Sequence, residues 1–406
     1  MVVGLNHRTA PVEVRERFWM SGCRQAEALS ILSQGEGIEE VLAFSTCNRT
    51  EFVFWGDATL AVNSVLRFLT AEYDLKLCEW NSFYRLLDEQ ALAHAFRVSC
   101  GLDSMCIGEE QIGRQVSSAW QQARNAGSSG RSLDAVLRKA LAVRRRVRQE
   151  TVLGSHFVSA PYAAIKLAEQ IFGSLATRNI VLLGAGKLGG IASKALVSRG
   201  ATCVSVVNRT DARAEELARK FGVRVCAFAD RWASLAQADL AISCTAAPGF
   251  VFAADDMRRL ATERKGRKLV LIDLALPRDI DPAVREFEGV LLYDLEDLER
   301  AIEPRSGSRA GEREAEQIVL AEVQGFRQEL MADRAAPEMT ALRLRLDEIC
   351  RQELESFRLE QGPFPKNQDQ LIVAISARIA HKIAGSLARE LKGLDSRGQA
   401  RVKAAV

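Results

Sequence analysis

The stretch N-I-V-L-L-G-A-G-K-L-G, residues 179–189, decides the fold of the central part of this 406-residue chain. Residues 180–183 form a short apolar run that is typical of a buried strand. Gly184, Gly186 and Gly189 follow with the spacing G-x-G-x-x-G, which lets the backbone approach a pyrophosphate at a helix N-terminus. A helical pattern comes next, as this motif requires. The stretch therefore predicts a dinucleotide-binding unit with a parallel sheet.

The type of dinucleotide is predicted from the end of the next expected strand, residues 203–207. An NAD site usually carries Asp or Glu there, whereas an arginine accommodates the 2′-phosphate of NADP. This chain has Asn208 and Arg209, so we predict NADPH. Strand candidates at residues 240–243 and 269–272 continue the alternation of a doubly wound sheet. The predicted cofactor-binding residues are Gly184, Ala185, Gly186, Lys187, Leu188, Gly189, Asn208, Arg209 and Thr210.

A second stretch, F-S-T-C-N-R-T-E at residues 44–51, contains the candidate nucleophile, Cys47. Apolar runs on both sides are typical of strands, which places Cys47 at or beside a turn that presents its side chain to solvent. Arg49 is close enough in sequence to lower the pKa of the thiol, which is about 8.5 in a free cysteine. Most lone cysteines are small buried hydrophobes, but the polar neighbours argue against burial here.

The region around this stretch is expected to form an α+β unit, with an antiparallel sheet covered on one face. His7 lies in a polar loop and His94 among apolar residues of a helical segment, and histidines in such places are more often structural than catalytic. Hydrogen-bonding side chains then gather in a short helical region, and their density fits recognition of a small polar substrate. They are Asp103, Ser104, Glu109, Gln111 and Gln115.

Composition narrows the function classes. The chain has 55 basic and 52 acidic residues, so its net charge of +3 excludes a strongly basic nucleic-acid binder and any polyanion contact must be local. A cationic helix at residues 131–148 is either a solvated face or a phosphate-binding surface. Nine cysteines without a C-x-x-C pair indicate neither a disulfide framework nor a metal site. We find no signal peptide and no membrane-spanning apolar run, so we predict a cytoplasmic protein.

The chain after Tyr293 is expected to be helical. Val319, Val323, Phe326 and Leu330 recur at spacings of three and four, which gives a narrow apolar stripe on a charged helix. Pro337 is expected to begin a new segment of this pattern. A helical tail with little core of its own indicates a dimerisation module, and a solvated extension is the alternative.

Five stretches together carry a resemblance to a known family. They are G-L-N-H-R-T-A-P-V at residues 4–12, S-T-C-N-R-T-E at 45–51, F-R-V-S-C-G-L-D-S-M-C-I-G-E at 96–109, G-A-G at 184–186 and I-D-L-A-L-P-R-D at 272–279. In combination they resemble the glutamyl-tRNA reductases. The resemblance runs from Val3 to about Leu330 and is weaker beyond.

The resemblance implies a multidomain α/β fold and a homodimer. Residues 1–153 would be an α+β catalytic domain that binds the glutamyl group, and residues 154–296 a Rossmann-like NADPH-binding domain with a parallel sheet. Residues 297–406 would be a long spinal helix with an all-α dimerisation domain. The implied reaction is reduction of glutamyl-tRNA(Glu) to glutamate-1-semialdehyde for porphyrin and haem biosynthesis. Glutamate-1-semialdehyde aminomutase is the implied partner that takes the aldehyde.

Site residues follow from the resemblance position by position. Cys47 would be the nucleophile that forms a thioester, which accepts hydride more readily than an ester does. His94 matches a histidine thought important for activity. Thr46, Asn48, Arg49, Ser104, Glu109, Glu110, Gln111 and Gln115 would bind the substrate. Glu110 and Gly113-Arg114 depart from the family pattern, which concerns the detail of the substrate loop more than the reaction.

Two other function classes stay open at this point. An NADPH-dependent dehydrogenase of another small substrate would explain the glycine turn, but not the polar residues around Cys47. A non-catalytic regulatory relative that binds tRNA and NADPH would keep the architecture, but it would have little reason to keep nucleophile and cofactor turn together.

Overall fold

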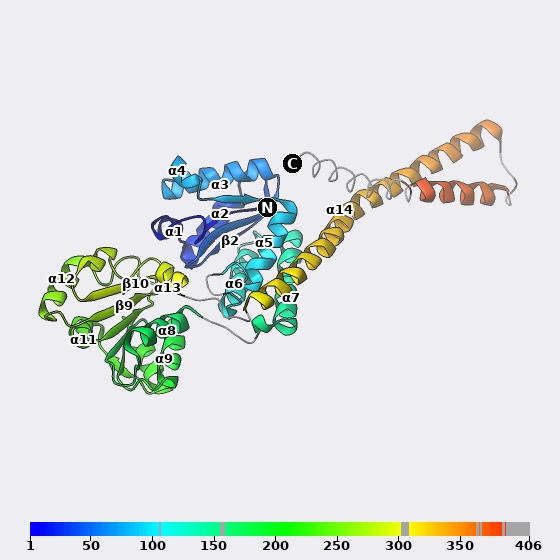
Figure 1. Ribbon diagram of the computed structural model, residues 1–406. Coiled ribbons are helices and arrows are strands. Elements are labelled where there is room, and N and C mark those ends of the chain that lie inside the picture. Colours follow the sequence, from blue (N-terminus) through cyan, green and yellow to red (C-terminus); the bar gives the residue numbers. More distant parts are fainter. Residues whose placement is uncertain are drawn as a thin grey trace. The chain divides into compact units, whose positions relative to one another are not determined.

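The computed structural model describes residues 1–104, 107–154, 159–301, 308–362, 365, 368–383 and 386 (Figure 1). The chain divides into two compact units, Met1–Val323 and Gln324–Val406. Within the described residues, the first unit contains a four-stranded sheet and a six-stranded sheet. The second unit is helical in the part described. The prediction of a multidomain α/β fold with a helical C-terminal part is confirmed.

The four-stranded sheet has the order β2-β3-β1-β4, and its neighbouring strands are antiparallel. The strands are β1 (Val2–Asn6), β2 (Ile38–Ser45), β3 (Arg49–Gly56) and β4 (Tyr84–Leu86). Ser45 pairs with Thr50 across β2 and β3, and Asn6 pairs with Arg49 across β1 and β3. The turn that carries Cys47 and the loop that follows β1 therefore leave the sheet at the same end.

Helices pack on both faces of this sheet, and the prediction that only one face is covered is wrong. The four consecutive residues from Val41 to Phe44 are all buried, although successive side chains of a strand point to opposite faces. The helices of this part are α1 (Val12–Phe18), α2 (Gly22–Leu32), α3 (Ala58–Tyr73), α4 (Leu77–Trp80), α5 (Asp88–Cys100), α6 (Glu110–Asn125) and α7 (Arg131–Glu150). Both α2 and α6 contact β2, and both α3 and α7 contact β3.

The six-stranded sheet is parallel throughout, in the order β10-β9-β8-β5-β6-β7. Its strands are β5 (Ile180–Leu183), β6 (Val204–Val207), β7 (Arg224–Cys226), β8 (Leu240–Ser243), β9 (Leu269–Asp273) and β10 (Val290–Tyr293). The strand order reverses at β5, so the glycine turn after β5 lies at the switch point where ligands of such sheets bind. The prediction of a doubly wound parallel sheet is confirmed.

Helices cover both faces of the parallel sheet and complete two apolar cores. One core includes residues of α8 (Ala160–Phe172), α9 (Lys187–Ser198), α10 (Asp211–Phe221) and α13 (Leu295–Ala301). The other core includes residues of α11 (Arg231–Gln237) and α12 (Ala254–Glu263). Short 3-10 helices occupy Val152–Gly154, Phe228–Asp230 and Pro282–Glu286.

The last helix bounded in full, α14, spans Ser308–Gln361 and belongs to both compact units. Val319 and Val323 of its predicted apolar stripe are buried. The apolar pattern expected to restart at Pro337 lies within the same helix, because α14 continues through that residue. A proline removes one backbone hydrogen bond, and a helix of 54 residues retains its other bonds on either side. Residues 302–307 and most residues after 383 lie outside the described part of the chain.

Among the described residues, none of the helices has the length and hydropathy needed to cross a membrane. The same residues contain no group of three or more His, Cys, Asp or Glu side chains placed to hold a metal ion.

Candidate functional site

The Cys47 turn is held from inside by backbone and side-chain hydrogen bonds. The Thr46 amide donates to the Arg49 carbonyl at 2.8 Å, and the Asn48 amide donates to Thr46 Oγ1 at 3.1 Å. The His7 amide donates to the Asn48 carbonyl at 2.9 Å, so the loop after β1 lies against the turn. These bonds fix the conformation of the turn before any ligand binds.

The turn is not presented to solvent, and this part of the sequence prediction is wrong. Thr46, Asn48 and Arg49 are buried, and Cys47 is only half-buried. The side chain of Cys47 packs against the apolar core that α8, α9 and α13 share with the parallel sheet. The polar neighbours are buried because they bond to one another, to His7, and to Glu51 and Asp103, which the local sequence does not reveal.

The electrostatic surroundings of Cys47 also differ from the prediction. Burial and the charge of Glu109 raise the pKa of the Cys47 thiol to about 12, although Arg15 and, to a smaller extent, Arg49 act to lower it. Arg49 lowers the pKa less than Arg15 does, and its own charge is balanced. Its guanidinium lies 2.7 Å from Glu51 Oε1 and 3.0 Å from Asp103 Oδ2. In this state the thiol is protonated at neutral pH.

Glu51 lies at the centre of a buried polar cluster that includes His94. Its Oε1 accepts hydrogen bonds from Arg49 Nη1 at 2.7 Å and from the Tyr84 hydroxyl at 2.5 Å, and it lies 3.0 Å from His94 Nε2. Burial alone would raise the pKa of Glu51, but the charges of His94 and Arg49 and the hydrogen bonds outweigh it and hold that pKa well below its usual range. The structure thus connects His94 to the Cys47 turn through Glu51 and Arg49.

Sequence reasoning missed Glu51 and Tyr84. The available signal was Gly4, which pairs with Glu51 across β1 and β3. A Cβ atom on Gly4 would lie 2.7 Å from Glu51 Cγ and 2.7 Å from the Thr50 carbonyl, so a glycine is needed for this carboxylate to fit. A glycine inside a strand often marks such a close approach.

Asp103 joins the N-terminal motif to the substrate-binding candidates. It lies 3.1 Å from Arg8 Nη1 through Oδ1 and accepts a hydrogen bond from Asn6 Nδ2 at 3.3 Å through Oδ2. Ser104 beside it is buried and hydrogen-bonds to Glu109.

The remaining predicted substrate residues lie at the start of α6. Burial raises the pKa of Glu109, while the charges of Arg49 and Lys187 oppose that rise. Lys187 is the first residue of α9, after the glycine turn, whereas Arg49 is the first residue of β3. Charges from both of these segments therefore act on the Glu109 carboxyl. Gln111 and Gln115 are half-buried on α6. Glu110 is the first residue of α6, and its side chain lies outside the described part of the structure, as do residues 105 and 106.

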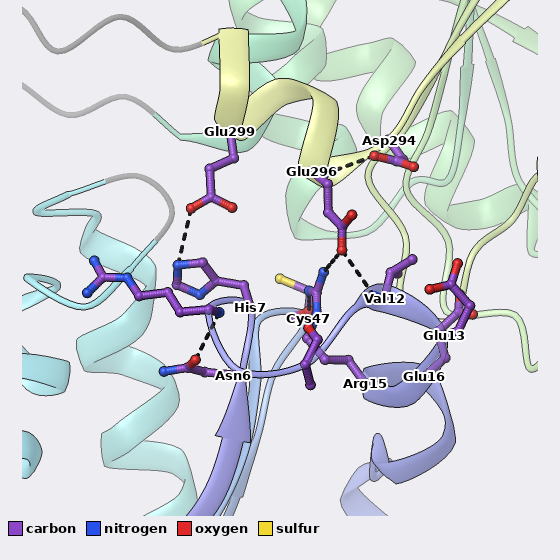
Figure 2. Close-up of polar contacts among 12 residues, drawn as sticks. Asn6, His7, Val12, Glu13, Arg15, Glu16, Cys47, Asp294, Glu296 and Glu299 are labelled. Atoms are coloured by element: carbon purple, nitrogen blue, oxygen red, sulfur yellow. Dashed lines mark hydrogen bonds and ion pairs between the residues drawn. The ribbon is translucent and has the colours of Figure 1, made fainter. Parts of the chain in front are cut away.

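His7 is a buried histidine with an open ring nitrogen. Its side chain is 3% exposed, and Nε2 lies 3.2 Å from Glu299 Oε1 on α13 (Figure 2). In the described residues, His7 Nδ1 and Asn48 Oδ1 are buried atoms without a hydrogen-bond partner. Buried polar atoms are nearly always paired, so these two are available to a ligand at the Cys47 turn.

Further contacts within the first compact unit join α1 to the dinucleotide-binding part, which comprises α8 to α13 (residues 160–301). Arg278, from the stretch I-D-L-A-L-P-R-D, is buried between Glu13 and Glu16, at 3.0 Å and 2.9 Å. Glu296 on α13 accepts hydrogen bonds from the Val12 amide at 3.0 Å and from Arg15 at 2.9 Å (Figure 2). The face of α13 that carries Glu296 and Glu299 thus contacts both segments beside Cys47.

The glycine turn has the geometry of a phosphate-binding turn. Gly184 has φ 106°, and a Cβ atom there would lie 2.8 Å from the Cys244 carbonyl. A Cβ atom on Gly189 would collide with the Gly184 carbonyl, whereas one on Gly186 would meet open space. The backbone at Gly186 is therefore accessible at the N-terminus of α9.

The predicted residues at the end of β6 lie beside this turn. Asn208 Oδ1 accepts a hydrogen bond from the Ala185 amide at 3.0 Å, and its Nδ2 donates to the Thr210 carbonyl at 2.8 Å. Arg209 is exposed, and Leu188 packs on the sheet core. The structure brings the predicted cofactor-binding residues together at one edge of the sheet, and the open cradle fits a dinucleotide pyrophosphate.

Three family models match successive segments of the chain. The N-terminal domain of glutamyl-tRNA(Glu) reductase matches residues 3–151, shikimate/quinate 5-dehydrogenase matches residues 166–301, and the dimerisation domain of glutamyl-tRNA(Glu) reductase matches residues 314–406.

Similar proteins cover almost the whole chain. The glutamyl-tRNA reductase of Desulforudis audaxviator is 40% identical over 356 residues, which are 87% of this chain and 80% of the relative. Glutamyl-tRNA reductase 2 of Koribacter versatilis is 35% identical over 94% of this chain and 88% of its own length. The solved glutamyl-tRNA reductase of Methanopyrus kandleri is 28% identical, covers 98% of this chain with 96% of its own, and superposes with a TM-score of 0.47. The chain belongs to the glutamyl-tRNA reductase family of oxidoreductases.

Proposed function

We propose that this protein reduces the glutamate esterified to tRNA(Glu) to glutamate-1-semialdehyde, with NADPH as reductant and a thioester on Cys47 as intermediate. This reaction is the first committed step of tetrapyrrole biosynthesis from glutamate. The observation that carries the proposal is the Cys47 turn, held rigidly beside buried polar groups and packed against the dinucleotide-binding part. Family membership supplies the substrate class.

Cys47 is proposed to attack the ester carbonyl. The new C–S bond replaces the C–O bond to the ribose of the tRNA, and the thiol proton leaves with the ribose oxygen. The thiol has a raised pKa because of burial and Glu109, so substrate binding must favour the thiolate. The ammonium group of the substrate, placed beside Glu109, would neutralise the charge of that carboxylate and so remove its effect on the pKa of Cys47.

The substrate-binding role proposed for the polar residues rests on their placement. Asn48 Oδ1 is buried and open to a donor, which suits the ammonium group of the substrate. Thr46, Arg49, Ser104, Glu109, Gln111 and Gln115 complete this set, and Glu110, whose side chain lies outside the described part of the structure, is proposed from the family resemblance alone. Arg49 is already paired with Glu51 and Asp103, so we assign it to shaping the site before binding a substrate carboxylate. His94 is proposed to act through Glu51, which holds Arg49 in place.

NADPH is proposed to bind at the glycine turn and supplies a hydride when bound. Gly184, Gly186 and Gly189 leave the backbone at the start of α9 open to the pyrophosphate. Arg209 is exposed at the end of β6, where its guanidinium suits the 2′-phosphate. Contacts of Arg278, Glu296 and Glu299 hold this part of the protein against the Cys47 turn, which limits access of water to the thioester.

The proposed partners follow from the same reaction. The protein is proposed to act as a homodimer through its dimerisation domain, matched at residues 314–406. Glutamyl-tRNA(Glu) is the substrate, and an aminomutase is proposed to take up the labile aldehyde. A cytoplasmic location is proposed, since aminoacyl-tRNA is the substrate.

The test is NADPH oxidation by the purified protein with glutamyl-tRNA(Glu), compared with free glutamate at the same concentration. We expect oxidation and aldehyde formation only with the tRNA ester. Turnover of a free amino acid without tRNA would instead support a dehydrogenase of another small substrate. Tight NADPH binding with no turnover of either compound would support the non-catalytic alternative.

A further inference from the structure

Arg15 on α1 is a buried cation that joins three segments of the first compact unit. Its side chain is 2% exposed. Nε donates to the Ala10 carbonyl at 3.2 Å, and Nη1 donates to the Cys47 carbonyl at 3.1 Å. Nη2 donates to Glu296 Oε1 at 2.9 Å. One guanidinium therefore connects the loop after β1, the Cys47 turn and α13 (Figure 2).

Glu296 is the carboxylate paired with Arg15 among the residues that the structure describes. The same Oε1 atom accepts the backbone N–H of Val12 at 3.0 Å. The Glu296 side chain is 38% exposed but Arg15 is buried, so loss of Glu296 would leave an uncompensated buried charge on Arg15. Glu296 comes from the dinucleotide-binding part and Arg15 from the part that carries Cys47. The charge balance at Arg15 therefore depends on the contact between α13 and α1.

We propose that Arg15 is a positioning residue for Cys47, and that its ion pair with Glu296 makes the reactivity of the thiol depend on the contact between α13 and α1. The proposal rests on Cys47 being the nucleophile. When α13 is in contact, Glu296 neutralises Arg15 and the apolar core covers the thiol. When the contact opens, the charge of Arg15 is no longer neutralised and favours the thiolate.

Arg49 cannot provide this coupling. Its two carboxylate partners, Glu51 and Asp103, belong to the same part of the protein as Cys47. The charge of Arg49 therefore stays balanced whether or not α13 contacts α1. Arg15 also acts more strongly than Arg49 to lower the pKa of Cys47. The other charged groups around the turn are Glu109 at the start of α6 and the pair of His7 with Glu299.

This coupling suits the two proposed steps, which are attack of Cys47 on the ester and hydride transfer to the thioester. Attack on the ester requires a thiolate, whereas a thioester accepts hydride without one. The open contact then favours acylation of Cys47. The closed contact protects the thioester and suppresses attack by a free thiol on other electrophiles.

The experiment measures alkylation of Cys47 by iodoacetamide between about pH 6 and 10 in the full-length protein. Mass spectrometry must resolve the peptide that contains Cys47, because the exposed Cys23 and Cys78 also react with iodoacetamide. Glu296→Gln keeps the acceptor oxygen but removes the charge. We expect it to accelerate alkylation of Cys47 at neutral pH about tenfold, since an unbalanced charge near a titrating group moves its pKa by about one unit or more.

Two further variants separate the role of Arg15 from simple exposure of the thiol. In an Arg15→Gln background, Glu296→Gln should no longer accelerate alkylation, whereas Arg15→Lys should preserve most of the acceleration. Asp297→Asn is the matched control, because Asp297 lies next to Glu296 on α13 but pairs with Arg285 and Arg300. It should leave the rate unchanged.

Wild-type alkylation kinetics in Glu296→Gln would overturn the proposal, and so would equal acceleration with and without Arg15. If Arg15→Gln does not fold, the proposal is tested by the rates of Cys47 alkylation in the Glu296→Gln and Arg15→Lys proteins. Alkylation needs neither tRNA nor NADPH, so its result is independent of whether glutamyl-tRNA is the substrate.

Discussion

Replacing Glu51 by Gln should destabilise the N-terminal part strongly. Glu51 is 3% exposed, and its Oε1 contacts Arg49, Tyr84 and His94 at 2.7, 2.5 and 3.0 Å. Breaking a buried ion pair on one side costs about 3–5 kcal/mol. Asp103 remains as a partner of Arg49, so we expect the lower end of that range. About 3 kcal/mol corresponds to a fall in Tm of about 6–12 °C for a cooperative unit of about 150–250 residues.

The assay is thermal unfolding of the full-length protein, followed by circular dichroism at several pH values. The folded pKa of Glu51 is depressed, so its contribution to the free energy of unfolding is complete above its unfolded pKa and is lost as pH falls through the folded pKa. The difference in Tm between wild type and Glu51→Gln should therefore be largest near neutral pH and shrink below about pH 4.

The matched control is Glu36→Gln. Glu36 lies 3.7 Å from Arg67 in an ion pair whose side chains are both 66% exposed, and such pairs contribute less than about 1 kcal/mol. An effect of Glu51→Gln as small as that of the control would show that the buried charge of Glu51 does not stabilise this part of the protein. A Tm difference that stays constant from pH 7 to 3 would show that shape, and not charge, is what Glu51 supplies.

Three further predictions concern cofactor preference, cofactor binding at the glycine turn and tRNA binding. Arg209→Ala should raise the KM for NADPH at least tenfold more than the KM for NADH, because only NADPH carries the 2′-phosphate; equal effects would assign Arg209 a structural role. Gly189→Ala should abolish cofactor binding, because its Cβ would collide with a backbone carbonyl, whereas Gly190→Ala, whose Cβ meets only a leucine methyl at 3.6 Å, should bind normally in a fluorescence titration. Arg145→Gln should weaken tRNA binding and reduce its dependence on salt, because Arg145 is exposed on α7. Arg146 pairs with Glu150 and Glu322, so Arg146→Gln should lower Tm and leave tRNA binding unchanged. A loss of tRNA binding in Arg146→Gln together with a lower Tm in Arg145→Gln would contradict these two roles.

Much of the fold follows from patterns that are local in sequence. The apolar run 180–183 and the three glycines after it specify a strand, a turn and a helix. A Cβ atom on Gly184 or Gly189 would come too close to a backbone carbonyl, and Gly186 keeps the backbone open at the start of the helix. The register that puts Cys47 in a turn follows likewise from two flanking strands. The boundaries proposed at residues 153 and 296 remain predictions.

The environment of Cys47 could not be predicted in the same way. Burial of the turn depends on α1 and on α13, which lies more than two hundred residues away, and neither contact leaves a local pattern. Sequence proximity therefore favoured Arg49 as the activating cation. In the structure Arg49 is engaged by Glu51 and Asp103, and Arg15 is the cation whose balance depends on a distant segment.

The thioester on Cys47 is tested most directly by incubating the protein with glutamyl-tRNA(Glu) in the absence of NADPH, quenching with acid and analysing the peptides by mass spectrometry. We predict one glutamyl group attached to the peptide that contains Cys47, no such adduct in Cys47→Ser, and loss of the adduct as aldehyde forms when NADPH is added. A Cys47→Ser protein that reduces glutamyl-tRNA at the wild-type rate would contradict a covalent intermediate on Cys47.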